Sequence, residues 1–367
     1  MGRIFQIEPS MDESEKQELQ KVIDSGWFTD GPRTKEFEKL FAKFVGVKYA
    51  IAVTSGTSAL FVGLKSKGIK NYDEVIVPDL TFVASPNSVE LCGGKPVLID
   101  IEEKSLNINQ KILEKCITKK TKAIMPVDFN GRSTDMSELR ENANKNNLFL
   151  IEDACHAIGS KYKQKHMGTL SDIGIFSFST PKIITTGQGG MIITNNKEIF
   201  EKCEELKDFG REKGMKKNMK KSFEHNSVGY NFKFTEFQAA VGIAQMRKLP
   251  TWIKRKKEIY KIYRENLSKI NHIKFIETNL KEETPWMIDI LVSNQKLRDK
   301  IINELEKVEI GTRIFYPPIH SLKPYKKNNN SFPISSKISR CGLWLPSSTS
   351  ITDENINRVC KKIKELF

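Results

Sequence analysis

A single lysine stands between two apolar segments in the stretch FSFSTPKIITTGQGGMIITN, residues 176–195. Lys182 follows the segment Gly174 to Phe178 and precedes the segment Met191 to Thr194, with a glycine cluster in between. A lysine on a turn between two buried strands either extends its amine to water along the surface or holds that amine for chemistry. A desolvated lysine beside a cation has a lowered pKa and can act as a nucleophile.

An acidic residue ends another apolar segment, in LFLIEDACHAIGS, residues 148–160. A carboxylate of Asp153 buried at that point is costly unless a cation pairs with it. A protonated pyridine nitrogen would be such a cation, and His156, three residues later, could reach the same ligand. The alternative for Asp153 is a helix cap, which is a common role for aspartate.

A turn rich in small hydroxyl residues lies in VTSGTSAL, residues 53–60. An apolar segment ends there, Ser55, Gly56, Thr57 and Ser58 form a turn, and a helix begins. The backbone N–H groups at the helix start, with the hydroxyls, could bind a phosphate. The alternative is an ordinary helix cap.

Two further residues are expected at the same edge. Phe82, in IVPDLTFVASPNS, follows a strand and precedes a helix, so its ring could stack on a planar ligand or simply pack in the core. Ser177 comes just before the turn that carries Lys182. Together the sequence provides a phosphate site, an acid for a ring nitrogen, a stacking ring and a lysine, which is the set that a pyridoxal phosphate enzyme requires.

The elements that would position these residues alternate between short apolar segments and amphipathic helices. The expected strands are Tyr49 to Val53, Glu74 to Val77, Pro96 to Asp100, Lys122 to Val127, Leu148 to Glu152, Gly174 to Phe178 and Met191 to Thr194. Helices are expected at Ser58 to Gly68, Ser85 to Cys92 and Met136 to Asn146. This pattern predicts an α/β fold with a mostly parallel sheet covered on both faces, which binds ligands outside the carboxyl ends of its strands.

The pattern changes near residue 250. A long helical stretch from Thr235 to about Ser268 is expected to break at Pro250, and shorter strands and helices follow it. We therefore predict a large domain over residues 1–249 and a smaller α+β domain over residues 250–367.

Composition excludes several classes. The 367-residue chain has a net charge of +15, but its lysines alternate with acids on helical stretches, which is typical of solvated faces rather than of nucleic-acid binding. The densest lysine stretch, residues 213–221, is expected to be a loop. No apolar stretch is long enough to span a membrane, no export signal is visible, and no histidine or cysteine spacing suggests a metal. We expect a cytoplasmic protein with free thiols.

The whole set of motifs resembles the DegT/DnrJ/EryC1 family of pyridoxal phosphate-dependent sugar aminotransferases, which has the aspartate aminotransferase-like fold type I. The resemblance covers nearly the whole chain, including SGTSAL, DEVIVPDLTFVAS, IEDACHAIGS, FSFSTPKIITTGQGG, GYNFKFTEFQAAVG and LPSS. It implies pyridoxal 5'-phosphate as cofactor, with pyridoxamine 5'-phosphate as its aminated form, L-glutamate as amino donor and a nucleotide-linked keto-sugar as acceptor.

The resemblance also assigns roles by position. Lys182 would form the Schiff base with the cofactor, Asp153 would pair with the ring nitrogen, and His156 would contact the phenolic oxygen. Phe82 would stack on the ring. The phosphate would be held by the segment Gly56, Thr57 and Ser58, by Ser177, and by Asn231 of a neighbouring subunit, which implies a homodimer with shared sites. Gln188 and Lys233 depart from the family's usual Glu and Arg.

The substrate is suggested by GTRIFYPPIHSLKPY, residues 311–325, which resembles the corresponding segment of the GDP-perosamine synthase branch. That branch aminates carbon 4 of GDP-4-keto-6-deoxymannose, for lipopolysaccharide O-antigen synthesis. Arg313, Tyr316 and His320 are the candidate substrate-binding residues, although an ion pair within the protein would explain Arg313 equally well. UDP- or dTDP-linked keto-sugars, aminated at carbon 3 or 4, are the alternatives.

Three other functions are disfavoured. The dehydratases of this family replace the catalytic lysine with histidine, whereas Lys182 is present here. A non-enzymatic regulator would not need an intact set of cofactor residues. A DNA-binding protein would be expected to show a helix-turn-helix with a basic recognition helix, and none is visible in the sequence.

Overall fold

The computed structural model describes residues 2–211, 224–328 and 331–367. The lysine-rich stretch 213–221 therefore lies outside the described residues. Within the described ranges, no helix is both long and apolar enough to cross a membrane. Over the same ranges, no group of three or more His, Cys, Asp or Glu side chains is placed to hold a metal ion.

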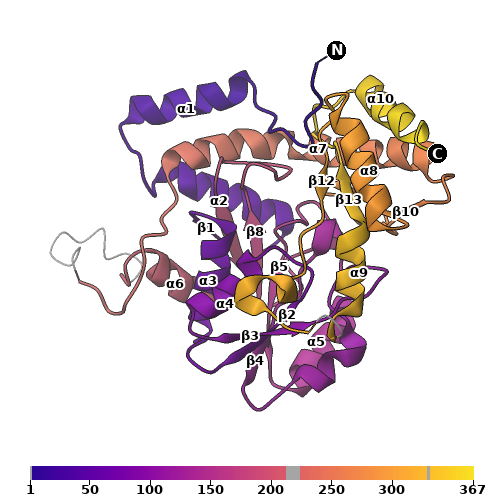
Figure 1. Ribbon diagram of the computed structural model, residues 1–367. Helices are drawn as coiled ribbons and strands as arrows, with labels where there is room; N and C mark the ends of the chain where they lie inside the picture. Colours follow the sequence, from indigo (N-terminus) through magenta and orange to yellow (C-terminus); the bar gives the residue numbers. More distant parts are fainter. Residues whose placement is uncertain (1, 212–223, 329–330) are drawn as a thin grey trace.

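A seven-stranded sheet forms the centre of the molecule (Figure 1). In spatial order its strands are β1 (Tyr49–Val53), β9 (Gly190–Thr194), β8 (Ile173–Ser177), β5 (Phe149–Asp153), β4 (Thr121–Ile124), β2 (Glu74–Pro78) and β3 (Lys95–Ile99). β9 is antiparallel to both of its neighbours, and every other neighbouring pair is parallel. This confirms the predicted mostly parallel sheet, and six strands end at the same edge.

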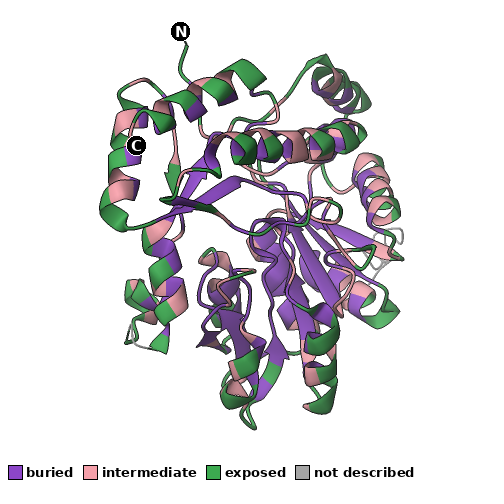
Figure 2. Ribbon diagram, turned by 90° about the vertical axis from the view of Figure 1, so that its right-hand side faces the viewer, coloured by how far each residue is buried: buried purple, intermediate pink, exposed green. Residues whose placement is uncertain are grey.

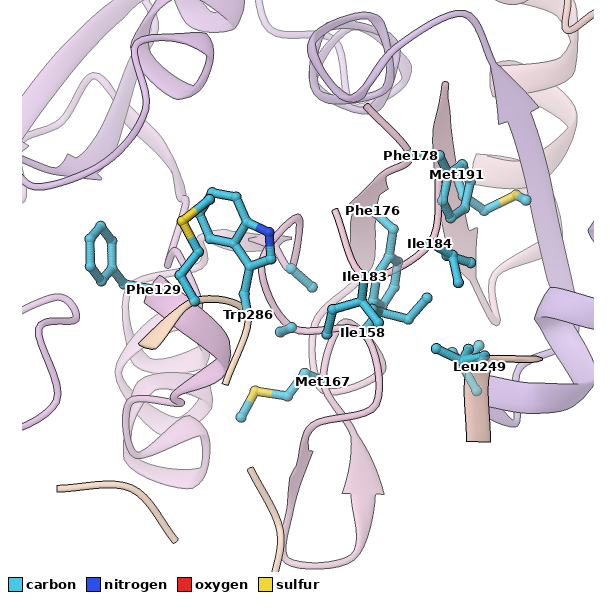
Figure 3. Packing of buried hydrophobic residues seen from close by; sticks show 14 of the residues in the cluster. Phe129, Ile158, Met167, Phe176, Phe178, Ile183, Ile184, Met191, Leu249 and Trp286 are labelled. Carbon is cyan, nitrogen blue, oxygen red and sulfur yellow. The ribbon is translucent and has the colours of Figure 1, made fainter. Parts of the chain in front are cut away.

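Helices cover both faces of this sheet, as the apolar strands require. Alternate residues of β1 show the two layers: Ala50 and Ala52 belong to the hydrophobic cluster on one face, and Ile51 and Val53 to that on the other. The first cluster includes Phe176 and Met191 from the sheet and Leu249 from α7 (Figure 3). The helices bury their inner sides and expose their outer ones (Figure 2). The helices of this part are α1 (Glu13–Ser25), α2 (Pro32–Val45), α3 (Gly56–Ser66), α4 (Ala84–Leu91), α5 (Met136–Lys145) and α6 (Lys197–Lys207), with 3-10 turns η1 (Gln110–Cys116) and η2 (Phe129–Gly131).

The long helix α7 (Glu236–Leu267) is continuous, so the predicted break at Pro250 is wrong. Thr235 begins it with a capping box in which Thr235 and Gln238 bond to each other's backbone N–H. Proline costs a helix about 3 kcal/mol, but α7 packs against α1, α2 and α10. Gln245, before Pro250, bonds to α1, and Asn266, after it, bonds to α10. Tertiary contacts outweigh the local preference here. The domain boundary at residue 250 remains a prediction, and α7 runs across it.

A second sheet follows α7. Its antiparallel strands lie in the order β10 (Ile273–Phe275), β11 (Ile288–Val292), β13 (Gly342–Leu345) and β12 (Arg313–Ile314). The same part of the chain contains the helices α8 (Gln295–Glu306), α9 (Pro333–Cys341) and α10 (Asp353–Lys364) and the 3-10 turns η4 (Ile319–Ser321) and η5 (Lys323–Tyr325). This confirms the predicted smaller α+β part. A separate short hairpin, β6 (Lys161–Tyr162) and β7 (Lys165–His166), lies earlier in the chain, between β5 and β8.

A buried ion pair joins the two parts of the chain. Arg132, just after η2, donates to both carboxylate oxygens of Asp289 on β11 and to the hydroxyl of Thr278 at 3.2 Å. Arg132 and Asp289 are both fully buried. Breaking such a pair leaves one charge unpaired in the interior, which costs more than the intact pair contributes.

Asp289→Ala is therefore expected to lower the free energy of unfolding by about 3–5 kcal/mol, measured by denaturant titration. The double change Arg132→Met with Asp289→Leu removes both charges and should recover most of that loss. An Asp289→Ala protein as stable as the parent protein would contradict the importance assigned to this pair.

Candidate active site

A cavity opens at the edge where the parallel strands end. Asp153 ends β5, Ser177 ends β8, and Gly56 begins α3 directly after β1. The following predicted residues line the cavity wall: Gly56, Thr57, Phe82, Asp153, His156, Ser177, Lys182, Arg313 and Tyr316. Arg313 and Tyr316 reach it from the smaller part of the chain, so both parts contribute to one site.

Lys182 lies in the turn between β8 and β9, where its backbone N–H donates to the carbonyl of Ser179 at 3.0 Å. The side chain as a whole is half-buried, but its Nζ lies 4.1 Å from the centroid of the Trp286 ring. Loss of hydration at this position, with a further contribution from Arg313, lowers the pKa of Lys182 to about 8. The uncharged form that a nucleophile requires is therefore far more populated near neutral pH than it is for an ordinary lysine.

Asp153 is 5% exposed, and its carboxylate accepts hydrogen bonds from Ser85 Oγ at 2.8 Å and from the backbone N–H of Cys155 at 3.2 Å. No ion pair joins Asp153 to a basic side chain within the part of the chain that the structure describes. A buried carboxylate without a cation is unfavourable. The site therefore fits a ligand that brings its own positive charge, such as a protonated ring nitrogen.

His156 is 5% exposed and stacks on Trp286, with ring centroids 3.9 Å apart. Burial, and then the nearby Lys182, holds the pKa of His156 well below its usual value, so the imidazole is neutral. Its Nδ1 accepts the backbone N–H of Asn130 at 3.4 Å. A neutral ring that accepts at Nδ1 carries its proton on Nε2, which is then available as a donor to a ligand.

The start of α3 has the features of a phosphate site. A Cβ at Gly56 would lie 3.0 Å from Ser177 Cβ and 3.2 Å from Cys155 Sγ, so only glycine lets β8 approach this closely. The N–H groups of the first helical turn have no acceptor within their own helix. That of Ser58 is satisfied by Ser55 Oγ at 3.0 Å, which leaves those of Gly56 and Thr57 for a ligand.

Ser58 is placed differently from the expectation. Its hydroxyl accepts the backbone N–H of Ser55 at 2.9 Å and donates to the carbonyl of Ser55 at 2.8 Å. This is a capping box, and Ser58 does not belong to the cavity wall. The hydroxyl of Ser58 holds the turn in shape, and the neighbouring Thr57 faces the cavity instead.

Two aromatic rings stand at the cavity. Phe82 is 49% exposed, and its ring centroid lies 5.4 Å from that of Tyr316. Burial raises the pKa of Tyr316 above its usual value, so its hydroxyl stays protonated. Arg313 is exposed on β12, and in the described chain no carboxylate pairs with it. The structure therefore does not support the ion-pair explanation of Arg313.

His320 is not at the cavity. Its ring is fully buried and its Nδ1 lies 2.7 Å from Asp79 Oδ2, while its backbone N–H donates to Asp79 Oδ1 at 2.8 Å. Asp79 follows β2 directly, so this contact fastens the segment after β12 to the large sheet. His320 therefore makes a structural contact and lies outside this cavity, and its assignment to the substrate stays a prediction.

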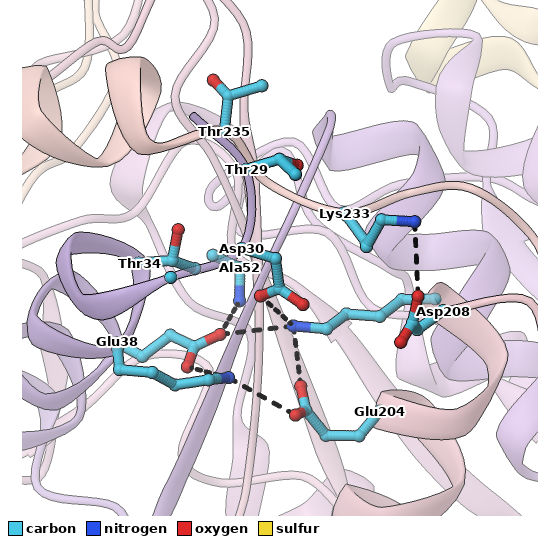
Figure 4. Close-up of polar contacts among 12 residues, drawn as sticks. Thr29, Asp30, Thr34, Glu38, Ala52, Glu204, Asp208, Lys233 and Thr235 are labelled. Atoms are coloured by element: carbon cyan, nitrogen blue, oxygen red, sulfur yellow. Dashed lines mark hydrogen bonds and ion pairs between the residues drawn. The ribbon is translucent and has the colours of Figure 1, made fainter. Parts of the chain in front are cut away.

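Asn231 is exposed and lies outside the cavity of its own chain. The two departures from the family pattern make contacts within the chain. Lys233 pairs with Asp208 at 3.3 Å (Figure 4) and lies over the Phe209 ring at 4.1 Å. Gln188 lies at the cavity wall, and its carbonyl accepts Gln238 Nε2 at 2.6 Å.

Several residues of the site were not predicted from the sequence, and three of them make contacts that matter for the argument. Ser85 bonds to Asp153, Cys155 lines the wall between Gly56 and Asp153, and Trp286 contacts both Lys182 and His156. Cys155 lies within the quoted motif IEDACHAIGS and could have been found there. Trp286, in the stretch TPWM, has no spacing that relates it to the lysine.

The fold and this site define a class: an α/β enzyme of the kind that binds pyridoxal phosphate at the carboxyl edge of its sheet. A sequence profile of the DegT/DnrJ/EryC1/StrS aminotransferase family matches residues 9–364, and the chain belongs to that family.

Three known proteins support the class. The GDP-perosamine synthases of Escherichia coli O157:H7 and Vibrio cholerae are 36% and 37% identical to this chain, over 98% of it and 97% and 98% of their own lengths. A Streptococcus pneumoniae protein solved in PMP and PLP forms superposes with a TM-score of 0.93, at 25% identity, over 100% of this chain and 98% of that one. The chain is a pyridoxal phosphate-dependent sugar aminotransferase.

Proposed function

We propose that this enzyme transfers the amino group of L-glutamate to carbon 4 of GDP-4-keto-6-deoxymannose. The observation that carries the proposal is the similarity to GDP-perosamine synthases over nearly the full length of both chains. The sequence of the segment that contains Arg313 and Tyr316 also resembles the GDP-perosamine synthase branch. Both residues lie at the wall of the cavity that Lys182 lines. The position of this segment fits a role in substrate recognition.

The cofactor's phosphate would be held at the start of α3. The backbone N–H groups of Gly56 and Thr57 point out of the first helical turn, and the hydroxyl of Ser177 lies close to Gly56. The partial positive charge at a helix N-terminus favours an anion at this position. These contacts fix one end of the cofactor without any contribution from Lys182.

The other end would be held by Asp153 and His156. The carboxylate of Asp153 keeps a proton on the ring nitrogen, because the charged pair is favoured in a site with little water. The Nε2–H of neutral His156 donates to an oxygen of the bound ring. When bound, the cofactor provides an electron sink for breaking the bond between the substrate carbon and its proton.

Lys182 would move the proton. Its uncharged Nζ would accept the proton from the α-carbon of the amino donor, and the protonated amine would then give that proton up again, which is general base and acid catalysis at one nitrogen. Its pKa of about 8 suits both steps near neutral pH. Phe82 lies at the cavity wall and would stack on the ring of the bound cofactor.

Arg313 and Tyr316 would bind the acceptor. The Arg313 guanidinium is suited to the diphosphate of a nucleotide sugar, because its planar donors match phosphate oxygens. The protonated hydroxyl of Tyr316 can donate to a sugar oxygen.

A panel of GDP-, UDP- and dTDP-linked 4-keto-6-deoxy sugars, each incubated with L-glutamate, tests the substrate. We expect amination of the GDP-linked mannose derivative to be at least about 10²-fold faster than that of the others, since a site built for one set of polar groups rejects analogues strongly. Mass spectrometry detects the amine and NMR assigns its carbon. Faster amination of a UDP- or dTDP-linked sugar, or amination at carbon 3, would assign a different branch of the family.

We also propose that Asn231 binds the phosphate in the site of a second copy of the chain. The exposure of Asn231 outside its own cavity supports this arrangement. Lys182→Ala and Asn231→Ala chains, each impaired alone, should then recover activity when mixed dimers form, because one of the two sites combines an intact Lys182 with an intact Asn231.

The matched control mixes Lys182→Ala with Asp153→Asn. Both of these residues line the cavity of the same chain, so neither site of a mixed dimer is complete and no recovery is expected. Native mass spectrometry would verify that the subunits exchange. Mixed dimers of the first pair that stay inactive would show that Asn231 serves its own subunit.

A further inference from the structure

Trp286 lies beside the two residues that would do chemistry on the cofactor. It comes from the loop between β10 and β11, in the smaller part of the chain, and only 1% of it is exposed. The face of its indole lies under Lys182 Nζ at 4.1 Å and against the His156 ring at 3.9 Å, with 25° between the planes of Trp286 and His156. Figure 3 shows the indole among the residues of the hydrophobic cluster, with Phe129 to one side and Ile183 to the other.

The indole is held by a hydrogen bond as well as by its ring contacts. Its Nε1–H donates to the carbonyl of Pro181 at 2.7 Å, and Pro181 is the residue before Lys182. A tryptophan here therefore contacts the lysine twice, through its ring face to the amine and through its N–H to the adjoining peptide. Phenylalanine would keep only the ring, and leucine would keep neither.

The loop that carries Trp286 is fixed in turn by Asn130. The side chain of Asn130 accepts the backbone N–H of Met287 at 2.7 Å and donates to the carbonyl of Met287 at 2.8 Å. Asn130 adopts the left-handed conformation, with φ of 57°, which asparagine tolerates better than most residues. Its backbone N–H also donates to His156, so one residue ties this loop to the wall of the cavity.

We propose that Trp286 is a positioning residue that holds the amine of Lys182 over its indole face and so presents it to the cofactor. The inference rests on the proposed role of Lys182. A flexible four-carbon side chain has many rotamers, and among the described residues no carboxylate lies at ion-pair distance from this amine to restrict it. The flat wall of Trp286 removes those rotamers that lead away from the cofactor, and the bond to Pro181 fixes the start of the side chain.

The experiment measures how fast cofactor-free protein forms its borohydride-reducible bond to added pyridoxal phosphate, as a function of pH. The rate should rise as the amine loses its proton, with a midpoint near its pKa of about 8, and then reach a plateau. At the plateau every amine is uncharged, so a difference between variants reports positioning rather than proton affinity. This readout does not depend on turnover.

Trp286→Leu is expected to lower the plateau rate at least about 10-fold, and Trp286→Phe by about 3-fold, since the positioning of a reacting group contributes strongly to rate. The rate of the first half-reaction with L-glutamate should fall by similar factors. Trp252→Leu is the matched control, because Trp252 is a buried indole of the same hydrophobic cluster that does not line the cavity.

A folded Trp286→Leu protein with the parent plateau rate would overturn the proposal. If that variant does not fold, Trp286→Phe decides, and a parent plateau rate in that protein overturns it equally. Identifying the peptide that is labelled in the parent protein tests the role of Lys182 independently of the role of Trp286. If that peptide lacks Lys182, the proposed site fails whatever the Trp286 variants do.

Discussion

Lys182→Ala is expected to lower turnover by at least about 10³-fold while the protein still binds its cofactor. General acid–base catalysis alone contributes about 10²–10⁴-fold, and the same side chain also provides the covalent attachment. The proposed phosphate and ring contacts come from Gly56, Thr57, Ser177 and Asp153, none of which the substitution changes. Binding should therefore survive, with a visible absorption changed from that of the parent protein.

Borohydride reduction followed by peptide mapping gives the measurement. In the parent protein the cofactor should be fixed to the peptide that contains Lys182, and in Lys182→Ala no peptide should be labelled. Lys182→Arg is the matched control, because arginine keeps the charge and length but cannot supply an uncharged amine. Activity of Lys182→Arg comparable to that of the parent would contradict the assigned role.

Burial alone does not single out this lysine. Lys207 is fully buried, but its Nζ lies 2.7 Å from Glu204 Oε1 and 3.5 Å from Glu38 Oε1. Figure 4 shows these two carboxylates. These carboxylates outweigh desolvation and hold the pKa of Lys207 far above its usual value, so the amine stays charged. Lys182 differs because it pairs with no carboxylate at ion-pair distance in the described chain.

Lys256 shows that a lowered pKa does not single out Lys182 either. Burial lowers the pKa of Lys256 to about 7, which is below that of Lys182. Its Nζ donates to the carbonyl of Ser347 at 2.6 Å, and it does not line the cofactor cavity. An uncharged amine is thus necessary but insufficient. What distinguishes Lys182 is its place on a turn at the carboxyl edge of the sheet, opposite Asp153 and the start of α3.

That place could be predicted from the sequence because parallel strands bring distant residues to one edge. The strand ends at Val53, Asp153 and Ser177 are far apart in the chain, yet the alternation of apolar segments and helices requires that they meet. The continuity of α7 through Pro250 could not be predicted in the same way, since it depends on contacts with helices at both ends of the chain.

The direction of a side chain is harder to predict than its place in the chain. Ser58 and Thr57 are neighbours in the motif, but a capping bond to Ser55 turns the Ser58 hydroxyl away from the cavity. His320 lies in the segment that resembles a substrate-binding region, but its partner Asp79 is 241 residues away. Trp286 was missed for the same reason, because its contacts are all long-range.

Asp153→Asn is expected to lower turnover on the order of 10²-fold, as the loss of a charged partner aimed at a reacting group does elsewhere. Without the carboxylate the proton affinity of the ring nitrogen should fall by about 1–3 pK units, which weakens the electron sink. Asparagine has nearly the same shape and can still accept the bond from Ser85. The fold and the phosphate contacts should therefore persist.

Asp79→Asn provides the matched control, because Asp79 also lies at the end of a parallel strand and is fully buried. Its carboxylate is already in contact with His320 Nδ1 at 2.7 Å, whereas that of Asp153 has no basic side chain at ion-pair distance among the described residues. Asp79→Asn should reduce thermal stability and leave the cofactor spectrum unchanged. Asp153→Asn should change the spectrum, while the cofactor-free protein, relieved of an unpaired buried charge, should be at least as stable as the parent. Two results together would contradict this role: a cofactor-free Asp153→Asn protein that is less stable than the parent, and an unchanged cofactor spectrum. They would show that Asp153 is paired within the protein and does not serve the ring nitrogen.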